Sequence, residues 1–142
     1  MVSESVLAIS TISLIVELVA FSLLLFGYHQ KRMRKYHKHG VAMTIAVALH
    51  LVVILTWMIY SLIAFFSSAS LDLGNILQVT ALTHVALGII AASVGVWLVG
   101  TWHLQTDVQK CFGRKRIMLA TITAWSGAFV LGCILYAVLV MS

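Results

Sequence analysis

The sequence predicts an all-α integral membrane protein, an up-down four-helix bundle with both termini on the outer side of the membrane. Three observations support this fold class. Of the 142 residues, 62% are hydrophobic and 9% are charged, which is too little charge to cover the surface of a soluble domain. The apolar residues form runs of about 20 or more, long enough to cross the ~30 Å hydrocarbon core. The basic residues are confined to two of the connections between these runs.

Four runs meet the length requirement. Each is expected to be a helix, because a membrane-spanning segment has to satisfy its own backbone hydrogen bonds. The expected helices cover, in order, residues 5–27, 41–66, 75–102 and 117–140. Their short connections make consecutive helices antiparallel neighbours and leave no room for a separate soluble domain. Residues 1–142 are therefore expected to form a single transmembrane domain in contact with the lipid bilayer.

The positive charge predicts the orientation. Loops rich in Lys and Arg stay in the cytoplasm, so we expect a multi-pass protein of the cell membrane with both basic loops cytoplasmic. Charge that flanks membrane spans suits anionic lipid headgroups, and nucleic acid is not an expected partner. The nine basic residues are Lys31, Arg32, Arg34, Lys35 and Lys38 in one connection and Lys110, Arg114, Lys115 and Arg116 in the other.

One carboxylate lies in the middle of the first expected helix, in the run "ISLIVELVAFSLLLF". An ionisable group at this depth is costly, so Glu17 should have a partner. Helical rise places Glu17 and His50 each about 15 Å from the cytoplasmic face, on adjacent antiparallel helices. A buried Glu17–His50 pair is therefore predicted. The two groups either satisfy one another, relay a proton, or form a metal-bound imidazole oriented by a carboxylate.

Histidines at the cytoplasmic end are the preferred cofactor ligands. His37 and His39 precede the second expected helix and His103 closes the third, at nearly the same level. Neutral imidazole is a good ligand for iron or copper. We therefore expect haem iron to bind His103 together with His37 or His39, although histidines at a membrane edge are also ordinary interfacial residues.

His84 in the third expected helix is a second cofactor candidate, as is His50. Helical rise makes their depths differ by roughly 10 Å, which argues against one haem held by both. Residues nearer to the depth of His84 are Trp57 and Met58, and a His/Met ligand set is known haem chemistry. Methionine at such a position is, however, more often a packing residue.

Motifs of other chemistries are missing from the sequence. It contains no CxxC, no CxxCH, no phosphate-binding glycine loop and no HExxH, which argues against a hydrolase and against covalent haem. Glycine and alanine in the third and fourth expected helices favour close helix packing. Tryptophans lie mostly near the ends of the spans and are interpreted as interfacial anchors. They are Trp57, Trp97, Trp102 and Trp125.

Three passages resemble a known family. "HGVAMTIAVAL" carries His39 and Met43, "LTHVALGIIAA" carries His84, and "GRKRIMLATITAWSGAFVLGCILY" begins with basic residues and ends with Gly and Tyr. This layout is similar to that of the small four-helix membrane proteins that include the cytochrome oxidase maturation factor CtaM. The resemblance covers roughly residues 33–140 and implies a link to respiratory haem–copper machinery. The sequence differs by having Arg114 and Arg116 where a histidine is expected.

Two functions are therefore expected as alternatives. The first is a small membrane protein of respiratory redox machinery that binds b-type haem through histidines and exchanges electrons with a quinone-like carrier or a larger complex. The second is an assembly factor or accessory subunit of a respiratory complex, acting through helix contacts or as a homo-oligomer. Both describe an electron carrier or assembly factor rather than a stand-alone enzyme. A proton-conducting element using Glu17 and His50 is a third interpretation.

Overall fold

The computed structural model describes residues 4–68, 75–102 and 113–141, without the side chains of residues 64–68. These residues are helical almost throughout. The elements are α1 (Glu4–Arg32), α2 (Tyr36–Val53), the π-helical segment η1 (Ile54–Met58), α3 (Ile59–Ser68), α4 (Ile76–Trp102) and α6 (Lys115–Met141). Four stretches are long and apolar enough to cross a membrane: Glu4–Arg32, Tyr36–Ile63, Ile76–Trp102 and Lys115–Met141. The protein is thus all-helical and has the spans of a multi-pass membrane protein.

Three of the four expected helix ranges are too short at their basic ends. The first helix, expected at 5–27, continues to Arg32, and the second, expected from 41, already begins at Tyr36. The expected ranges stop where the apolar residues stop, whereas a helical backbone satisfies its own hydrogen bonds equally well in the headgroup region. The last helix likewise begins at Lys115 rather than at residue 117.

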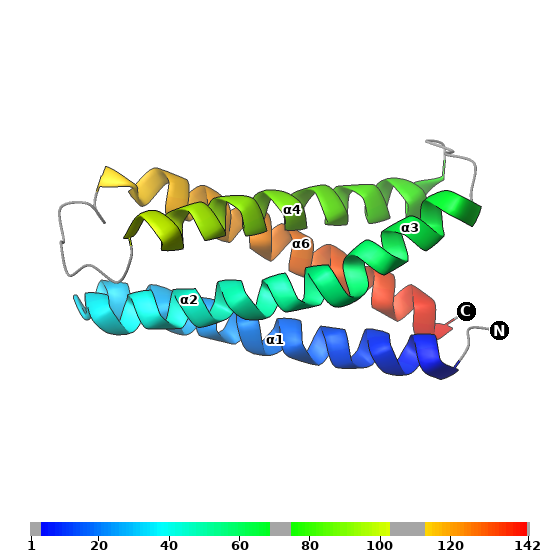
Figure 1. Cartoon of the computed structure of the whole chain (residues 1–142), viewed down its shortest axis with the longest axis horizontal. Helices are drawn as coiled ribbons and strands as arrows, with labels where there is room; N and C mark the ends of the chain where they lie inside the picture. Colours follow the sequence, from blue (N-terminus) through cyan, green and yellow to red (C-terminus); the bar gives the residue numbers. More distant parts are fainter. Residues whose placement is uncertain (1–3, 69–74, 103–112, 142) are drawn as a thin grey trace.

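The helices pair as two hairpins. α1 packs mainly along α2, and α4 along α6, while smaller contacts join α1 to α6 and α2 to α4. Figure 1 shows the start of α1 and the end of α6 at one end of the molecule, and the junction of α1 with α2, the end of α4 and the start of α6 at the other. The end that carries Arg34, Lys35 and Arg114 is called the basic end below, and the end that carries Glu4 and Met141 the terminal end.

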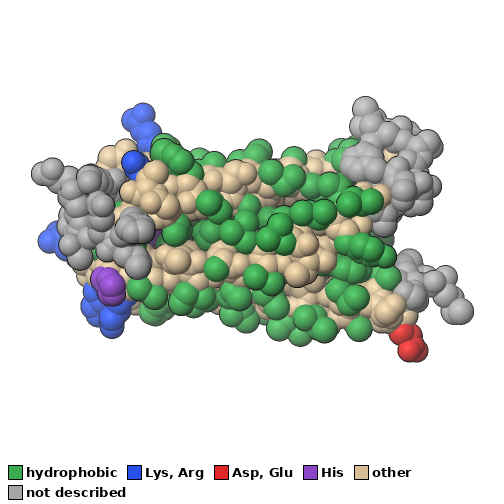
Figure 2. Space-filling model, in the orientation of Figure 1, with side chains coloured by type: hydrophobic (Ala, Val, Ile, Leu, Met, Phe, Trp, Pro, Cys, Tyr) green, Lys and Arg blue, Asp and Glu red, His purple; other side chains and the backbone are tan. Residues whose placement is uncertain are grey.

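The surface between these two ends is apolar. Figure 2 shows hydrophobic side chains along the whole body, with Lys and Arg gathered at the basic end. Leu55, for example, is 66% exposed. The side chains packed inside are mostly small, such as Ala20, Ala46 and Ala91, each of which is 0% exposed. Large residues outside and small ones at the helix contacts are typical of a protein whose solvent is lipid.

The second span bends at the π-helical segment η1. Its wider turn is closed by the Ile59 N–H, which donates to the Ile54 carbonyl five residues earlier. A π-bulge is a recognised cause of helix kinks and is frequent near functional sites. In Figure 1, α3 diverges from α1 beyond this point. The hairpin of α1 and α2 is therefore tight in its basic half and splayed in its terminal half.

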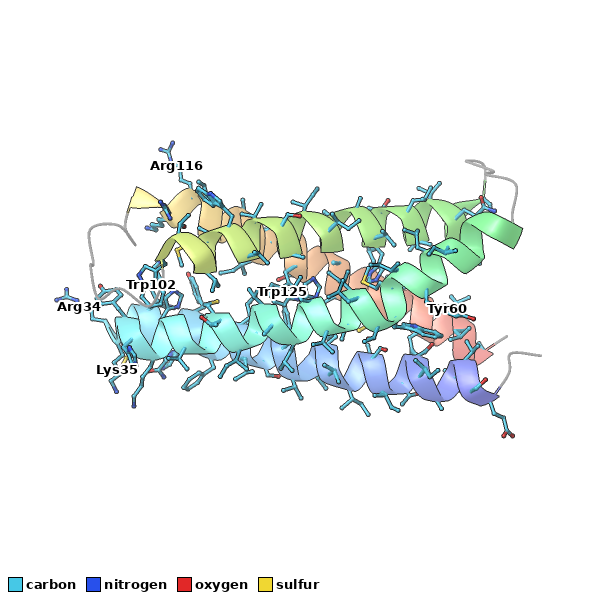
Figure 3. The ribbon with its side chains drawn as sticks, in the orientation of Figure 1. Arg34, Lys35, Tyr60, Trp102, Arg116 and Trp125 are labelled. Atoms are coloured by element: carbon cyan, nitrogen blue, oxygen red, sulfur yellow. The ribbon has the colours of Figure 1, made fainter. Side chains whose placement is uncertain are left out.

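Close packing at the basic end depends on a glycine. A Cβ atom at Gly40 of α2 would overlap the indole ring of Trp102 on α4. Figure 3 shows Trp102 lying at this end of the helices, near the labelled Arg34 and Lys35. The absence of a side chain at Gly40 therefore lets the two hairpins approach one another.

We predict that Gly40→Ala destabilises the protein by about 1–3 kcal/mol, because the added methyl group forces Trp102 to move. The measurement is the thermal unfolding midpoint of the protein in mild detergent. Gly100→Ala is the matched control, because a Cβ placed at Gly100 meets no described atom within 4 Å. Alanine should be neutral or mildly stabilising there. Equal effects of the two changes would show that Trp102 does not depend on Gly40.

Candidate functional site

A buried hydrogen-bond network around Glu17 joins the four spans. The Glu17 carboxylate lies 2.8 and 2.9 Å from Nδ1 of His50, through Oε1 and Oε2 respectively. The indole N–H of Trp125 donates to Glu17 Oε1 at 2.6 Å. The second ring nitrogen of His50 lies 3.4 Å from the Gly88 carbonyl. α1, α2, α6 and α4 each contribute one member, and these four residues are called the Glu17 network below.

The contact between Glu17 and His50 is the one that helical rise predicts. The His50 side chain is 4% exposed and that of Glu17 14%, so the two groups meet inside the protein. Both ring nitrogens of His50 face oxygen atoms, of Glu17 and of Gly88. A ring engaged on both sides has no nitrogen left for iron unless one of these contacts breaks, so His50 is the weaker of the predicted cofactor ligands.

Trp125 was missed as a member of this network. From its position in the sequence we interpreted Trp125 as an interfacial anchor. In the structure it is 1% exposed and packs against His50, with ring centroids 4.4 Å apart. Figure 3 shows it midway along the molecule. The signal that could have found it is chemical: a buried carboxylate accepts several hydrogen bonds, and an indole at mid-depth is a donor that needs an acceptor.

A cavity of about 610 Å³ extends from the Glu17 network to the terminal end. It is called the terminal-end cavity below. Its volume falls within the usual range of ligand pockets, about 300–1,000 Å³. Residues of all four spans line it, and most are apolar. The polar lining residues are Ser10, Ser13, Glu17, His50, Ser61, Asn75, Gln78, His84 and Tyr136.

His84 projects into this cavity from α4. Its Nδ1 lies 2.7 Å from the carbonyl of Ala128 on α6. A carbonyl can only accept, so Nδ1 carries the proton and the neutral ring has its lone pair on Nε2. Gly132 leaves room for the ring, since a Cβ there would lie 2.9 Å from Cε1 of His84. This arrangement is the one that usually orients a metal-binding histidine.

The distance expected between the His50 and His84 levels is an overestimate. His50 meets the Gly88 carbonyl, and His84 lies one helical turn before Gly88 on α4. Four residues of helix correspond to about 6 Å rather than 10 Å. The larger value results from counting residues from assumed helix ends. Both histidines line the terminal-end cavity, as does Met58, which is the partner that a His/Met ligand set requires.

His39 has a similar tautomer in a much smaller space. It is 4% exposed, and its Nδ1 lies 2.8 Å from the Gly27 carbonyl, which fixes the proton on Nδ1. The adjoining basic-end cavity has a volume of only about 80 Å³ and is lined by Trp102, Arg114 and Trp125 among others. This space holds a few water molecules or a side chain, and it is too small for a macrocycle.

The remaining candidate ligands do not form a centre within the described residues. His37 is exposed on the first turn of α2, and His103 lies outside the described part of the chain. Across residues 4–68, 75–102 and 113–141, no three His, Cys, Asp or Glu side chains are close enough together to hold a metal ion. The structure thus places His50 in the Glu17 network, His39 and His84 against backbone carbonyls, and His37 at the surface.

Comparison of the chain with protein-family models, curated proteins and solved structures found no match.

We predict that Trp125→Phe costs about 1–3 kcal/mol of stability, because the Glu17 carboxylate loses a buried donor while the packing volume is nearly kept. The measurement is a double-mutant cycle with Glu17→Leu, read by thermal unfolding in detergent. In the Glu17→Leu background the same change should cost clearly less. Additive costs would mean that the 2.6 Å contact contributes no net stability.

Proposed function

We propose that this protein is a small integral membrane redox protein that holds b-type haem in the terminal-end cavity, where His84 would bind the iron. The observation that carries the proposal is the imidazole of His84. Its Nδ1 proton is donated to the Ala128 carbonyl, and the ring borders a cavity of about 610 Å³. The resemblance to the family that includes CtaM supports a place in respiratory redox machinery.

The chemistry of the lining residues fits haem. The lone pair of His84 is on Nε2, which is a common ligand atom for haem iron. Met58 lines the same cavity and offers a thioether, so it would be the second residue able to hold the iron. The other walls are largely apolar, with Trp57, Leu82 and Leu135 among them, as the faces of a macrocycle require.

The chain's own residues would orient the ligand and set its environment. The Ala128 carbonyl fixes the tautomer and direction of the His84 ring, and Gly132 keeps the ring's place open. The surrounding apolar spans provide a low dielectric, which tunes a redox potential. Haem, when bound, supplies one-electron transfer. The electron partner would be a lipid-soluble quinone-like carrier or a larger membrane complex.

The test is the absorption spectrum of the protein expressed with haem supply and purified in mild detergent. We expect a Soret band that shifts on reduction with dithionite and is lost in His84→Ala. His37→Ala is the matched control and should keep the band, because His37 is exposed. Met58→Leu should keep haem but alter the reduced spectrum and the midpoint potential. If His37→Ala lost haem as fully as His84→Ala, the result would contradict the assignment to His84 and favour a site at the basic end.

A colourless protein with the wild-type sequence would contradict the haem proposal. If that protein co-purified with a respiratory complex, it would favour the alternative of an assembly factor or accessory subunit.

We further propose that the basic end faces the cytoplasm and both termini the outer side. The asymmetry of charge supports this: Arg34 and Lys35 are exposed at one end, and Glu4 lies at the other. Loops rich in Lys and Arg are retained in the cytoplasm.

The orientation can be tested by labelling introduced cysteines in intact cells with a membrane-impermeant maleimide. Glu4→Cys should react, and Lys35→Cys should react only after the membrane is permeabilised. Cys111 and Cys133 are replaced by serine in both variants. The reverse pattern, or labelling of both sites from outside, would refute the proposed orientation.

A further inference from the structure

The Glu17–His50 pair is built to hold a proton that either partner can carry. With the proton on His50, Nδ1–H donates to the Glu17 carboxylate and Nε2–H to the Gly88 carbonyl. With the proton on Glu17, its O–H donates to Nδ1, and Nε2–H still donates to Gly88. Trp125 N–H donates to Glu17 in both cases. Moving the proton therefore breaks none of the hydrogen bonds in the network.

The terminal end and the basic end differ in how easily water reaches the Glu17–His50 pair. Towards the terminal end, the cavity of about 610 Å³ begins at Glu17 and His50 and extends to Asn75, an exposed residue just before α4. Side chains that can bind water lie along its length, including Ser13 and Tyr136, whose hydroxyl is 2.9 Å from that of Thr11. A mostly apolar cavity of this size can still hold several water molecules where polar side chains line it, because each water needs two to four polar partners.

Towards the basic end, the pair is closed off by apolar layers. Ala20 and Ala46, about one helical turn beyond Glu17 and His50 respectively, are 0% exposed, and Leu24 is 1% exposed. The Trp125 ring lines the basic-end cavity while its N–H contacts Glu17, so it stands between the two cavities. The basic-end cavity is only about 80 Å³. Water therefore has no comparable polar route from that end among the described residues.

We propose that Glu17 and His50 form a proton-binding site that exchanges protons with the aqueous phase at the terminal end only. This is a half-channel that loads a proton from one side, rather than a path across the membrane. Other titratable groups that share the cavity are His84 from α4 and Tyr136 from α6, and Cys133 lies beside Gly132 on α6. Along α1, η1 and α3, no further charged side chain lines it among the described residues.

The inference does not depend on bound haem, because every group in it belongs to the chain. The two proposals can therefore fail separately. Haem and water would occupy the same cavity, so the proton-binding proposal describes the protein without haem, and its test uses haem-free protein.

The test is isotope-edited infrared spectroscopy of the full chain in oriented proteoliposomes. The sequence contains two glutamates, Glu4 and Glu17, so ¹³C-glutamate labelling of Glu4→Gln leaves Glu17 as the one labelled carboxyl group. The measured signal is the carboxyl stretch of labelled Glu17. We expect it to change when the compartment facing the terminal end is acidified, and to stay constant when the other compartment is acidified while the gradient lasts.

Two serine variants of α1 control for access. Ser13→Leu places an apolar side chain in the cavity wall and should slow the response of the Glu17 signal. Ser22→Leu makes the same change on an exposed, lipid-facing position and should leave the rate unchanged. A response from the basic side, equal responses from both sides, or no change of the signal between pH 4 and 9 would overturn the proposal. Equal rates in the two variants would exclude the cavity as the route.

Discussion

A single carboxylate constrains how the four spans are arranged. An uncompensated charge in hydrocarbon costs several kcal/mol, so Glu17 is tolerated only where donors surround it. The structure supplies them from different helices, with His50 of α2 at 2.8 Å and Trp125 of α6 at 2.6 Å. His50 in turn reaches the Gly88 carbonyl of α4. These hydrogen bonds, together with close packing at small residues, limit the relative heights and rotations of the four spans.

The network divides the molecule into two halves with different packing. On its basic side, alanines at the helix contacts and the missing side chain at Gly40 allow the backbones to approach, and the cavity there is about 80 Å³. On its terminal side, the π-helical turn at Ile54–Met58 diverts the second span, and a cavity of about 610 Å³ results. Both proposed activities use this looser half, since a ligand and water both need space that close packing removes.

The buried histidines differ in their hydrogen bonds to backbone carbonyls, and this difference distinguishes the roles proposed for them. His39 and His84 each donate Nδ1–H to a carbonyl of a neighbouring helix, which leaves Nε2 as an acceptor. His50 has oxygen atoms on both sides and suits proton exchange instead. His84 borders the cavity of about 610 Å³, whereas His39 borders the cavity of about 80 Å³. This difference in volume is the reason to prefer His84 as the ligand-binding histidine.

Run length and helical rise were enough to predict the four apolar spans and the contact of Glu17 with His50, because they set heights along a helix. They did not determine which face of each helix points inward. Spans that are apolar on all sides carry no periodic signal for this choice. Three features therefore came from the folded arrangement of the helices: the contact of Trp125 with Glu17, the Ala128 carbonyl at His84, and the cavity beside the bend at η1. These contacts depend on helix rotation, which side-chain packing and buried hydrogen bonds decide together.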